Sequence, residues 1–272
     1  MYYTVSQYMN YFHAIILGIV EGITEFLPVS STFHLLQTAK FLGLEQTEFT
    51  KLFEVVIQSG AVFSLIFLFQ KEVWMTKRLY LKLFVATIPI LGAGFLLHST
   101  IKNVFFENAG LLTYVFIVVG LVFLAVEWFV GRHSYRLQKG LLDVSYLQAF
   151  LIGFAQAVAL VPGVSRSGSV IIAMMLLNYK REDAAAFSLA LSLPTIFAAS
   201  LYDIYKSKDL LMSGAATEQI DVLVVGFIVS FVVAYFAAKW FVSFLQKHTL
   251  KTFAIYRILA GIILLALGFV LK

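Results

Sequence analysis

Two acidic residues stand close together in an otherwise apolar stretch near the N-terminus. Glu21 and Glu25 are four residues apart, so on a helix their carboxylates project from the same face. Two carboxylates this close repel each other in a medium of low dielectric, and a divalent cation or a shared proton would relieve the repulsion. The pair is therefore a candidate metal site, and the alternative is a solvated end of a helix.

Three hydroxyl residues and a histidine follow the acids. Residues 21–34 read EGITEFLPVSSTFH, so Ser30, Ser31 and Thr32 come just after a proline. A Ser or Thr at this place commonly caps the next helix, which accounts for one of the three. The others could act as a nucleophile or donate hydrogen bonds to phosphate. His34 lies three residues beyond Ser31, where it could serve as base or acid, although most lone histidines are structural.

A second polar turn lies in the other half of the chain. Residues 162–169 read PGVSRSGS and lead into another apolar stretch. A glycine-flanked turn that opens a helix offers backbone N–H groups to an anion, and an arginine can bind phosphate with two donors. We therefore predict a phosphate site at Ser165, Arg166 and Ser167. The alternative, that Arg166 reaches the membrane surface, is disfavoured by the apolar segments on both sides.

One further polar pair lies inside the first long apolar segment. Glu54 and Gln58 are again four apart and could either pair two helices or form a wall of the same cavity. We favour the cavity. Acids that can hold a cation, a hydroxyl–histidine pair and an arginine turn suit chemistry on a phosphate ester or diphosphate of a lipid.

The composition is that of a protein that crosses a membrane several times. Of 272 residues 61% are hydrophobic and 13% are charged, and the mean hydropathy is +0.90. A soluble domain carries about 25% charged residues. The net charge of +5 is scattered over short loops, which set membrane orientation and do not indicate nucleic acid binding. The absence of cysteine excludes disulfide and thiolate chemistry.

Apolar segments of about 20 residues predict the membrane-spanning helices. Six qualify: residues 49–69, 79–97, 111–130, 184–202, 222–245 and 253–271. Two shorter stretches, 11–20 and 146–161, end at the polar turns, and the second resumes at 171–177. Broken helices at membrane depth must be buried in protein or line a wet cavity, so both are interpreted as re-entrant helical hairpins. The predicted fold class is an all-α polytopic membrane protein.

The loops and an internal similarity predict an inverted-topology repeat. If the basic loops, among them 71–78, 132–139 and 247–251, are cytoplasmic, both termini lie outside and the hairpins enter from opposite sides. The segment 99–110 is then an outer loop. A single shift along the chain places Gly18, Glu21, Val29, Ser30 and Ser31 on Gly153, Gln156, Val164, Ser165 and Arg166. We therefore expect one integral membrane domain, 1–272, with halves of approximately 1–135 and 136–272.

Three motifs together resemble the BacA/UppP family of undecaprenyl-diphosphate phosphatases. They are EGITEFLPVSSTFH, FEVVIQSGAV and PGVSRSG, and the resemblance runs over essentially the whole chain. It implies hydrolysis of undecaprenyl diphosphate to the monophosphate, which recycles the lipid carrier of cell-wall synthesis and confers bacitracin resistance. It also implies the bacterial plasma (inner) membrane, dependence on Mg²⁺ or Ca²⁺, and an active site that opens to the outer side.

The resemblance assigns roles by motif position. The matching residues are Glu21 and Glu25 for the paired acids, Ser31 and His34 for the chemical step, and Ser165, Arg166 and Ser167 for the phosphate-binding turn. Two positions depart from the family pattern: Phe33 replaces a glycine and Val170 replaces a threonine. A rival hypothesis is a transporter or flippase of polyprenyl phosphate lipids, and a third is a protein that only binds the lipid. The sequence does not determine the oligomeric state, and a homodimer is compatible with it.

Overall fold

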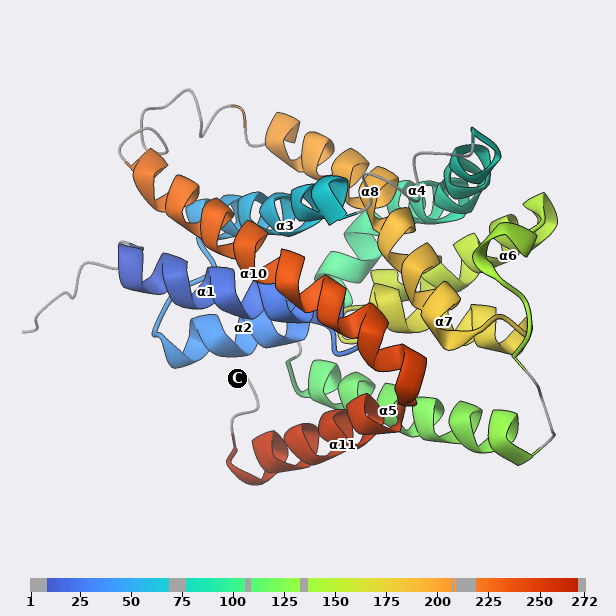
Figure 1. Cartoon of the computed structure of the whole chain (residues 1–272). Helices are drawn as coiled ribbons and strands as arrows, with labels where there is room; N and C mark the ends of the chain where they lie inside the picture. The colour runs from blue at the N-terminus through green and yellow to red at the C-terminus, as the bar shows by residue number, and fades with distance from the viewer. Residues whose placement is uncertain are drawn as a thin grey trace, which may run out of the picture.

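The protein is built from helices alone in the part of the chain that can be described. A computed structural model describes residues 9–68, 77–105, 109–132, 137–206, 208 and 219–268. These residues form no strand, and their one β-bridge, between Lys139 and Tyr179, is isolated. The helices lie against one another in a bundle (Figure 1), and many large apolar side chains are exposed on its surface. The prediction of an all-helical polytopic membrane protein is confirmed.

The helices have the following bounds. They are α1 Tyr11–Thr24, α2 Ser31–Phe41, α3 Glu48–Leu68, α4 Lys77–Phe105, α5 Ala109–Arg132, α6 Tyr146–Ala157, α7 Arg166–Leu176, α8 Arg181–Lys206, α10 Ile220–Lys247 and α11 Lys251–Ala266. Two 3-10 turns flank α6: η1 Leu141–Asp143 before it and η2 Val158–Leu160 after it.

Five of these helices are long and apolar enough to cross a membrane. They are α3, α4, α5, α8 and α10, and each coincides with a predicted span. The sixth predicted span, 253–271, corresponds to α11, which has 16 residues and ends at Ala266, while residues 269–271 lie outside the described part. The helix stops before Gly268, which adopts a positive φ of 64° that ends an α-helix. Among the described residues five helices are therefore long enough to span a membrane, and α11, at the sixth predicted span, is shorter.

Three predicted boundaries were wrong, for related reasons. The helix α1 continues through Glu21 to Thr24, and α7 begins at Arg166, five residues before the predicted 171. Polar side chains do not stop a helix, because the backbone hydrogen bonds that form it do not involve them. The predicted outer loop 99–110 is helical as far as Phe105 because α4 continues into it. Lys71 and Arg136, of the predicted basic loops, lie outside the described residues.

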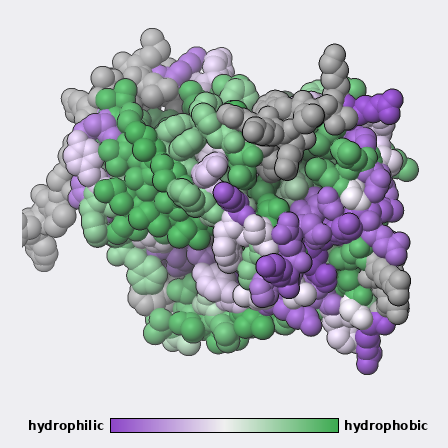
Figure 2. Space-filling view, viewed as in Figure 1, coloured by the Kyte–Doolittle hydropathy of each residue, from purple (hydrophilic) through white to green (hydrophobic). Residues whose placement is uncertain are grey.

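Large apolar side chains cover much of the surface. Phe84, Phe95, Leu147 and Phe236 are each more than 60% exposed, which in water would be an aggregation hazard and in lipid is expected. Figure 2 shows apolar residues over the face formed by α1 and α10, and polar residues near the C-terminal end of α10 and the adjoining loops. This separation fits a molecule that lies in a bilayer with one polar end in water.

The two halves of the chain repeat the same local structure at one constant spacing. The helices α1 and α6 begin at Tyr11 and Tyr146, and each is preceded by a capping box, at Asn10 and Ser145. The helices α2 and α7 have 11 residues each and begin at Ser31 and Arg166. Backbone with positive φ also recurs at this spacing, at Ser30 and Ser165 and at Gly43 and Asn178. The repeat thus lies in the backbone conformation as well as in the residues.

In each half, the first helix of the hairpin packs on a long helix of the other half, and equivalent glycines lie at the two contacts. In α1, a Cβ added at Gly18 would lie 3.0 Å from the Gly226 carbonyl oxygen of α10; in α6, one at Gly153 would lie 2.4 Å from that of Ala86 in α4. Figure 1 shows α1 lying along α10, and α6 packs on α4 in the same way. Each hairpin is therefore held by a long helix of the other half, which places the two hairpin turns side by side.

A leucine at position 153 is expected to disrupt this packing. Overpacking typically costs about 1–3 kcal/mol, and here the obstacle is backbone that cannot move aside. Gly153→Leu should lower the melting temperature in detergent and the yield of monodisperse protein, measured by differential scanning fluorimetry and size-exclusion chromatography. The matched control is Gly92→Leu in α4, where an added Cβ meets nothing within 4 Å. Equal stability of the two variants would contradict the packing argument.

Candidate active site

A polar cavity of about 170 Å³ lies between the turns of the two hairpins. Its wall includes seven of the predicted residues: Glu25, Ser30, Ser31, Thr32, Gln58, Ser165 and Arg166. Apolar side chains of α4 and α8, Ile90 and Ile196, complete one side. Residues that are far apart in the sequence thus meet at one place, as the repeat predicts.

Two helices begin at this cavity. Ser30 is the N-cap of α2 and Ser165 is the N-cap of α7, and both line the wall. The first backbone N–H groups of a helix have no partner within the helix, and the helix dipole makes this end positive. The hydroxyl of Ser165 accepts one of these bonds, from the Gly168 amide at 3.3 Å. The other first-turn amides make the cavity suited to an anion.

The backbone is strained at both N-caps. Ser30 has φ 65° and ψ 94°, and Ser165 has φ 80° and ψ 114°. Residues other than glycine in such conformations cost about 1–3 kcal/mol each and persist only where the surroundings hold them. At these conformations the chain turns sharply, and the next residues, Ser31 and Arg166, both line the cavity.

Glu25 links the two hairpins. Its Oε2 accepts a hydrogen bond from the Ser31 hydroxyl at 2.6 Å, and its Oε1 accepts one from the Arg166 guanidinium at 3.1 Å. Both side chains of the ion pair are largely buried, with 12% of Arg166 and 4% of Glu25 exposed. A carboxylate therefore connects the hydroxyl of one turn to the cation of the other.

Arg166 is held in place from α8 as well. Its guanidinium donates to the Ser192 hydroxyl and, at 3.4 Å, to the Ser188 carbonyl oxygen. The contacts with Glu25 and with α8 hold the guanidinium in place, and its planar fork is the geometry that binds phosphate oxygens in pairs.

Glu21 lies fully buried beside this network, behind the cavity wall. Neither carboxylate oxygen has a hydrogen-bond partner among the described residues, although Glu25 is close enough for the two to share a proton. An unpaired carboxylate in such a place is costly, so a proton or a cation must neutralise it. Glu21 and Glu25 therefore fit either a shared proton or a divalent cation, which proteins often hold by one or two carboxylates together with substrate phosphates. The described residues contain no cluster of three or more metal-binding side chains.

His34 makes its hydrogen bonds to Ser30 and Tyr256 in the structure, and not to the Ser31 hydroxyl. Its Nδ1 donates to the Ser30 carbonyl oxygen at 2.8 Å, which leaves Nε2 to accept from the Tyr256 hydroxyl at 2.6 Å. The ring also stacks on Tyr256 with centroids 5.7 Å apart. The hydroxyl of Ser31 is bonded to Glu25 instead. The predicted role of His34 in proton transfer remains a prediction, and Glu25 is the base nearest to the serine.

Two other predicted residues lie off the cavity wall. The Ser167 hydroxyl donates to the Leu27 carbonyl oxygen at 3.0 Å, so it joins the second hairpin to the turn of the first. Glu54, which is half-buried in α3, accepts from Gln46 at 3.2 Å. The structure brings Gln58 to the cavity and leaves Glu54 one helical turn away from it.

Sequence reasoning missed two residues of α11. Tyr256 supports His34, and Arg257 donates to backbone of both hairpin turns. Arg257 lies near the start of the sixth predicted span, and an ionisable residue inside such a span is by default a functional candidate. That rule would have drawn attention to Arg257, whereas nothing local distinguishes Tyr256 from the other tyrosines.

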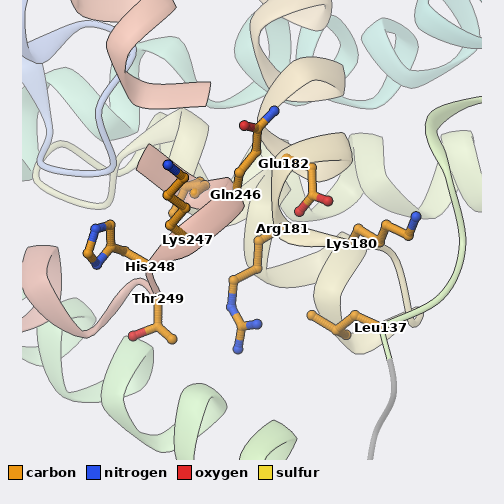
Figure 3. Close-up of a pocket in the computed structure, with 9 residues that line it drawn as sticks. Leu137, Lys180, Arg181, Glu182, Gln246, Lys247, His248 and Thr249 are labelled. Atoms are coloured by element: carbon orange, nitrogen blue, oxygen red, sulfur yellow. The ribbon is translucent and has the colours of Figure 1, made fainter. Parts of the chain in front are cut away.

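A second cavity, of about 350 Å³, lies at the polar end of the molecule. It is built from two basic loops, with Lys180 and Lys247 on its wall (Figure 3). Arg181 there is paired with Glu127 at 2.5 Å, and Glu127 also accepts from the Leu250 amide at 2.8 Å. None of the predicted site residues lines this cavity, so it is separate from the hairpin site.

Comparison with known proteins assigns the family. The model of the family described as bacitracin resistance protein BacA matches residues 14–263. The chain belongs to the BacA family. Proteins named undecaprenyl-diphosphatase resemble it over nearly their whole length. The protein of Wolinella succinogenes is 43% identical over an alignment that covers 94% of this chain and 98% of the relative. The protein of Persephonella marina is 44% identical, with the same coverage of both chains. The predicted family is confirmed.

The two departures from the BacA pattern face the protein core in the structure. Phe33 is 2% exposed and stacks on Phe116 with centroids 4.0 Å apart. Val170, on α7, is fully buried in the main apolar cluster. Neither lines the hairpin cavity. Both side chains therefore pack behind the turns and take no part in the cavity wall.

Proposed function

We propose that this protein is an undecaprenyl-diphosphatase that releases inorganic phosphate from the lipid diphosphate and leaves the monophosphate. The observation that carries the proposal is the meeting of two helix N-termini, Arg166 and the Glu25–Ser31 pair at one cavity. Positive groups on both sides of a small polar cavity suit a diphosphate, and a hydroxyl bonded to a carboxylate suits attack on phosphorus.

The diphosphate is held by the second hairpin. Arg166, still bonded to Glu25 and Ser192, donates its remaining N–H groups to the phosphate oxygens, and the first amides of α7 and α2 donate to them as well. These groups stabilise the negative charge that develops on the transferring phosphoryl group and its leaving oxygen. The long apolar tail extends along the lipid-exposed surface of the bundle.

Ser31 and Glu25 carry out the chemical step by one of two routes. In the first, the Ser31 oxygen bonds to the terminal phosphorus as the anhydride bond to the lipid monophosphate breaks, and Glu25 accepts the serine proton; water then hydrolyses the phosphoserine. In the second, Ser31 orients a water that attacks directly. The hydrogen bond of 2.6 Å between Ser31 and Glu25 suits either route.

Glu21 and Glu25 would hold a divalent cation, Mg²⁺ or Ca²⁺. When bound, the cation neutralises charge on the diphosphate and on the two carboxylates. The unpaired oxygens of Glu21 support this part of the proposal. The counterpart of Glu21 in the repeat is Gln156, which is buried and uncharged, so the acidic site belongs to the first hairpin alone.

The arrangement in the membrane is also part of the proposal. We take the two hairpins as re-entrant, the repeat as inverted, and the cavity as open to the outer side of the bacterial plasma membrane, with both termini outside. The exchanged contacts of α1 with α10 and of α6 with α4 support a repeat of this kind, in which sites form where two broken helices meet. The same architecture would serve a lipid flippase, which is the second candidate.

Phosphate release separates these candidates. Purified protein in detergent, given a C55 diphosphate with Mg²⁺ or Ca²⁺, should release inorganic phosphate, and excess chelator should stop the release. A flippase without hydrolytic activity releases none under any of these conditions. Light scattering on the same preparation tests the homodimer that the sequence allows.

A trapping experiment with Ser31→Ala decides between the two chemical routes. If Ser31 is the nucleophile, brief reaction with terminally ³²P-labelled diphosphate should leave label on the wild-type protein after acid quench and none on Ser31→Ala. The variant should lose activity by about 10³-fold or more, as removal of a nucleophile does. If the wild type carries no label and the variant retains more than a tenth of the activity, direct attack by water is the route.

A further inference from the structure

Arg257 is the largest fully buried side chain of the described residues. It lies in the middle of α11, and its hydrogen-bond partners are backbone carbonyls only. Its Nε donates to Phe116 at 3.1 Å, one terminal nitrogen donates to Pro28 at 3.2 Å, and the other donates to Gly163. No ion pair of Arg257 occurs within the described part of the chain.

Two of these partners are equivalent positions of the repeat. Pro28 and Gly163 correspond under the shift that relates the two halves, and each lies two residues before a strained N-cap serine, Ser30 or Ser165. One guanidinium therefore holds the same carbonyl in each hairpin turn. Ser31 and Arg166, which face each other through Glu25, follow these turns by three residues. Arg257 thus joins the two turns at equivalent positions, in addition to the links made by Glu25 and Ser167.

The aromatic residues of α5 hold Arg257 itself. The carbon of its guanidinium lies 4.3 Å from the ring centroid of Phe116 and 5.4 Å from that of Phe123. Such contacts stabilise a buried cation that has no carboxylate partner. Phe33 stacks on the same Phe116 ring, so this departure from the BacA pattern supports the arginine from the first hairpin.

Arginine is the side chain suited to this place. The turn carbonyls have no helical partner, and an unsatisfied carbonyl at membrane depth costs several kcal/mol. A guanidinium presents donors in a planar fork that reaches three carbonyls at fixed angles, whereas lysine has one nitrogen and neutral residues have fewer donors.

We propose that Arg257 is a positioning residue for the phosphatase: it joins the two hairpin turns and so sets Ser31 and Arg166 at the separation that the reaction needs. Arg257 itself does not line the cavity. The inference rests on the proposed phosphatase activity, but the geometry that it predicts can be measured without that activity.

The test compares Arg257→Gln and Arg257→Lys with Arg181→Gln. Arg181 is a matched control because it too is a largely buried arginine that joins separate helices, at the opposite end of the protein. All three variants should melt at lower temperature than the wild type. Only the Arg257 variants should lose turnover: kcat per folded molecule should fall about 100-fold in Arg257→Gln, the effect of a misplacement of about 1 Å, and Arg257→Lys should recover part of it.

A distance measurement reports the positioning directly. The chain has no cysteine, so spin labels can be attached at Lys40→Cys on α2 and Leu176→Cys on α7, both exposed positions. Double electron–electron resonance should give a broader distance distribution in Arg257→Gln than in the wild type, and an unchanged one in Arg181→Gln.

Several results would overturn the proposal. The first is that Arg257→Gln folds and keeps the wild-type kcat, and the second is that Arg181→Gln loses as much kcat as Arg257→Gln. The third is that the distance distribution does not change in Arg257→Gln. The fourth is that both Arg257 variants fail to fold although Arg181→Gln folds. If wild-type protein releases no phosphate, the proposed function is wrong, while the distance measurement still decides whether Arg257 positions the turns. The two failures are therefore distinguishable.

Discussion

Replacing Arg166 by glutamine is expected to lower kcat/KM for phosphate release by about 100-fold or more. Removing one preorganised donor to the charge that develops in a transition state typically lowers kcat by about 10²–10³-fold. Arg166→Gln removes the cation that faces the diphosphate and leaves Glu25 with an unpaired oxygen in the cavity. Steady-state release of phosphate from a polyprenyl diphosphate, with protein concentration corrected for folded fraction, measures the effect.

Arg166→Lys should not restore the activity. Lysine keeps the charge but cannot bond Glu25, Ser192 and a phosphate oxygen in one plane, as the guanidinium can. The appropriate control is Lys139→Gln, at the polar end of the molecule away from the cavity, which should leave kcat/KM unchanged. Activity above one tenth of the wild type in Arg166→Gln would show that the phosphate is bound elsewhere.

Replacing Glu21 by glutamine is expected to change stability and activity in opposite directions. In chelator, Glu21→Gln should be more stable than the wild type by about 1–3 kcal/mol, because the amide is neutral, whereas the buried carboxyl of Glu21 lies beside Glu25 and must take up a proton to become neutral. Its activity should fall about 100-fold or more if Glu21 holds the cation, because charge on the transferring phosphoryl group is then no longer neutralised. Thermal unfolding in chelator and phosphate release with Mg²⁺ are the two measurements.

The dependence of the melting temperature on metal, and a control variant at Glu127, test whether Glu21 holds the cation. A cation that binds only the folded protein should raise the melting temperature of the wild type with concentration and leave that of Glu21→Gln unchanged. Glu127→Gln is the matched control, since Glu127 is similarly buried but satisfied by Arg181 and the Leu250 amide. It should lose stability with activity retained. If Glu21→Gln is destabilised in chelator as much as Glu127→Gln, then Glu21 has a structural partner and the metal proposal fails.

Two equivalent positions of the repeat carry different functional groups of the site. Ser31 and Arg166 are each the first residue of the second arm of a hairpin, and both follow a strained serine. The same backbone therefore presents a hydroxyl in one half and a guanidinium in the other, with Glu25 bonded to both. Because each hairpin packs on a long helix of the other half, neither half encloses the cavity alone.

The sequence by itself determined the class of protein and most of its chemistry. Composition and apolar segments of about 20 residues predict a polytopic membrane protein because lipid selects for both directly. The acids, hydroxyls and arginine were found because polar groups are costly in apolar surroundings and are retained there only for a purpose. The repeat was visible because its positions recur at one constant offset along the chain, and the family because its motifs are contiguous.

The tertiary structure alone decided which of these groups touch. In the structure the Ser31 hydroxyl bonds to Glu25, whereas His34 bonds to Tyr256. The Glu21 carboxylate is buried without a hydrogen-bond partner among the described residues, and Arg257 donates to backbone of both turns. Such pairings join residues up to 229 positions apart. They depend on how far each helix extends and on which face it turns inward, and a shift of one residue along a helix rotates a side chain by about 100°. Local sequence patterns limit these choices, but only the packing of the whole bundle selects one.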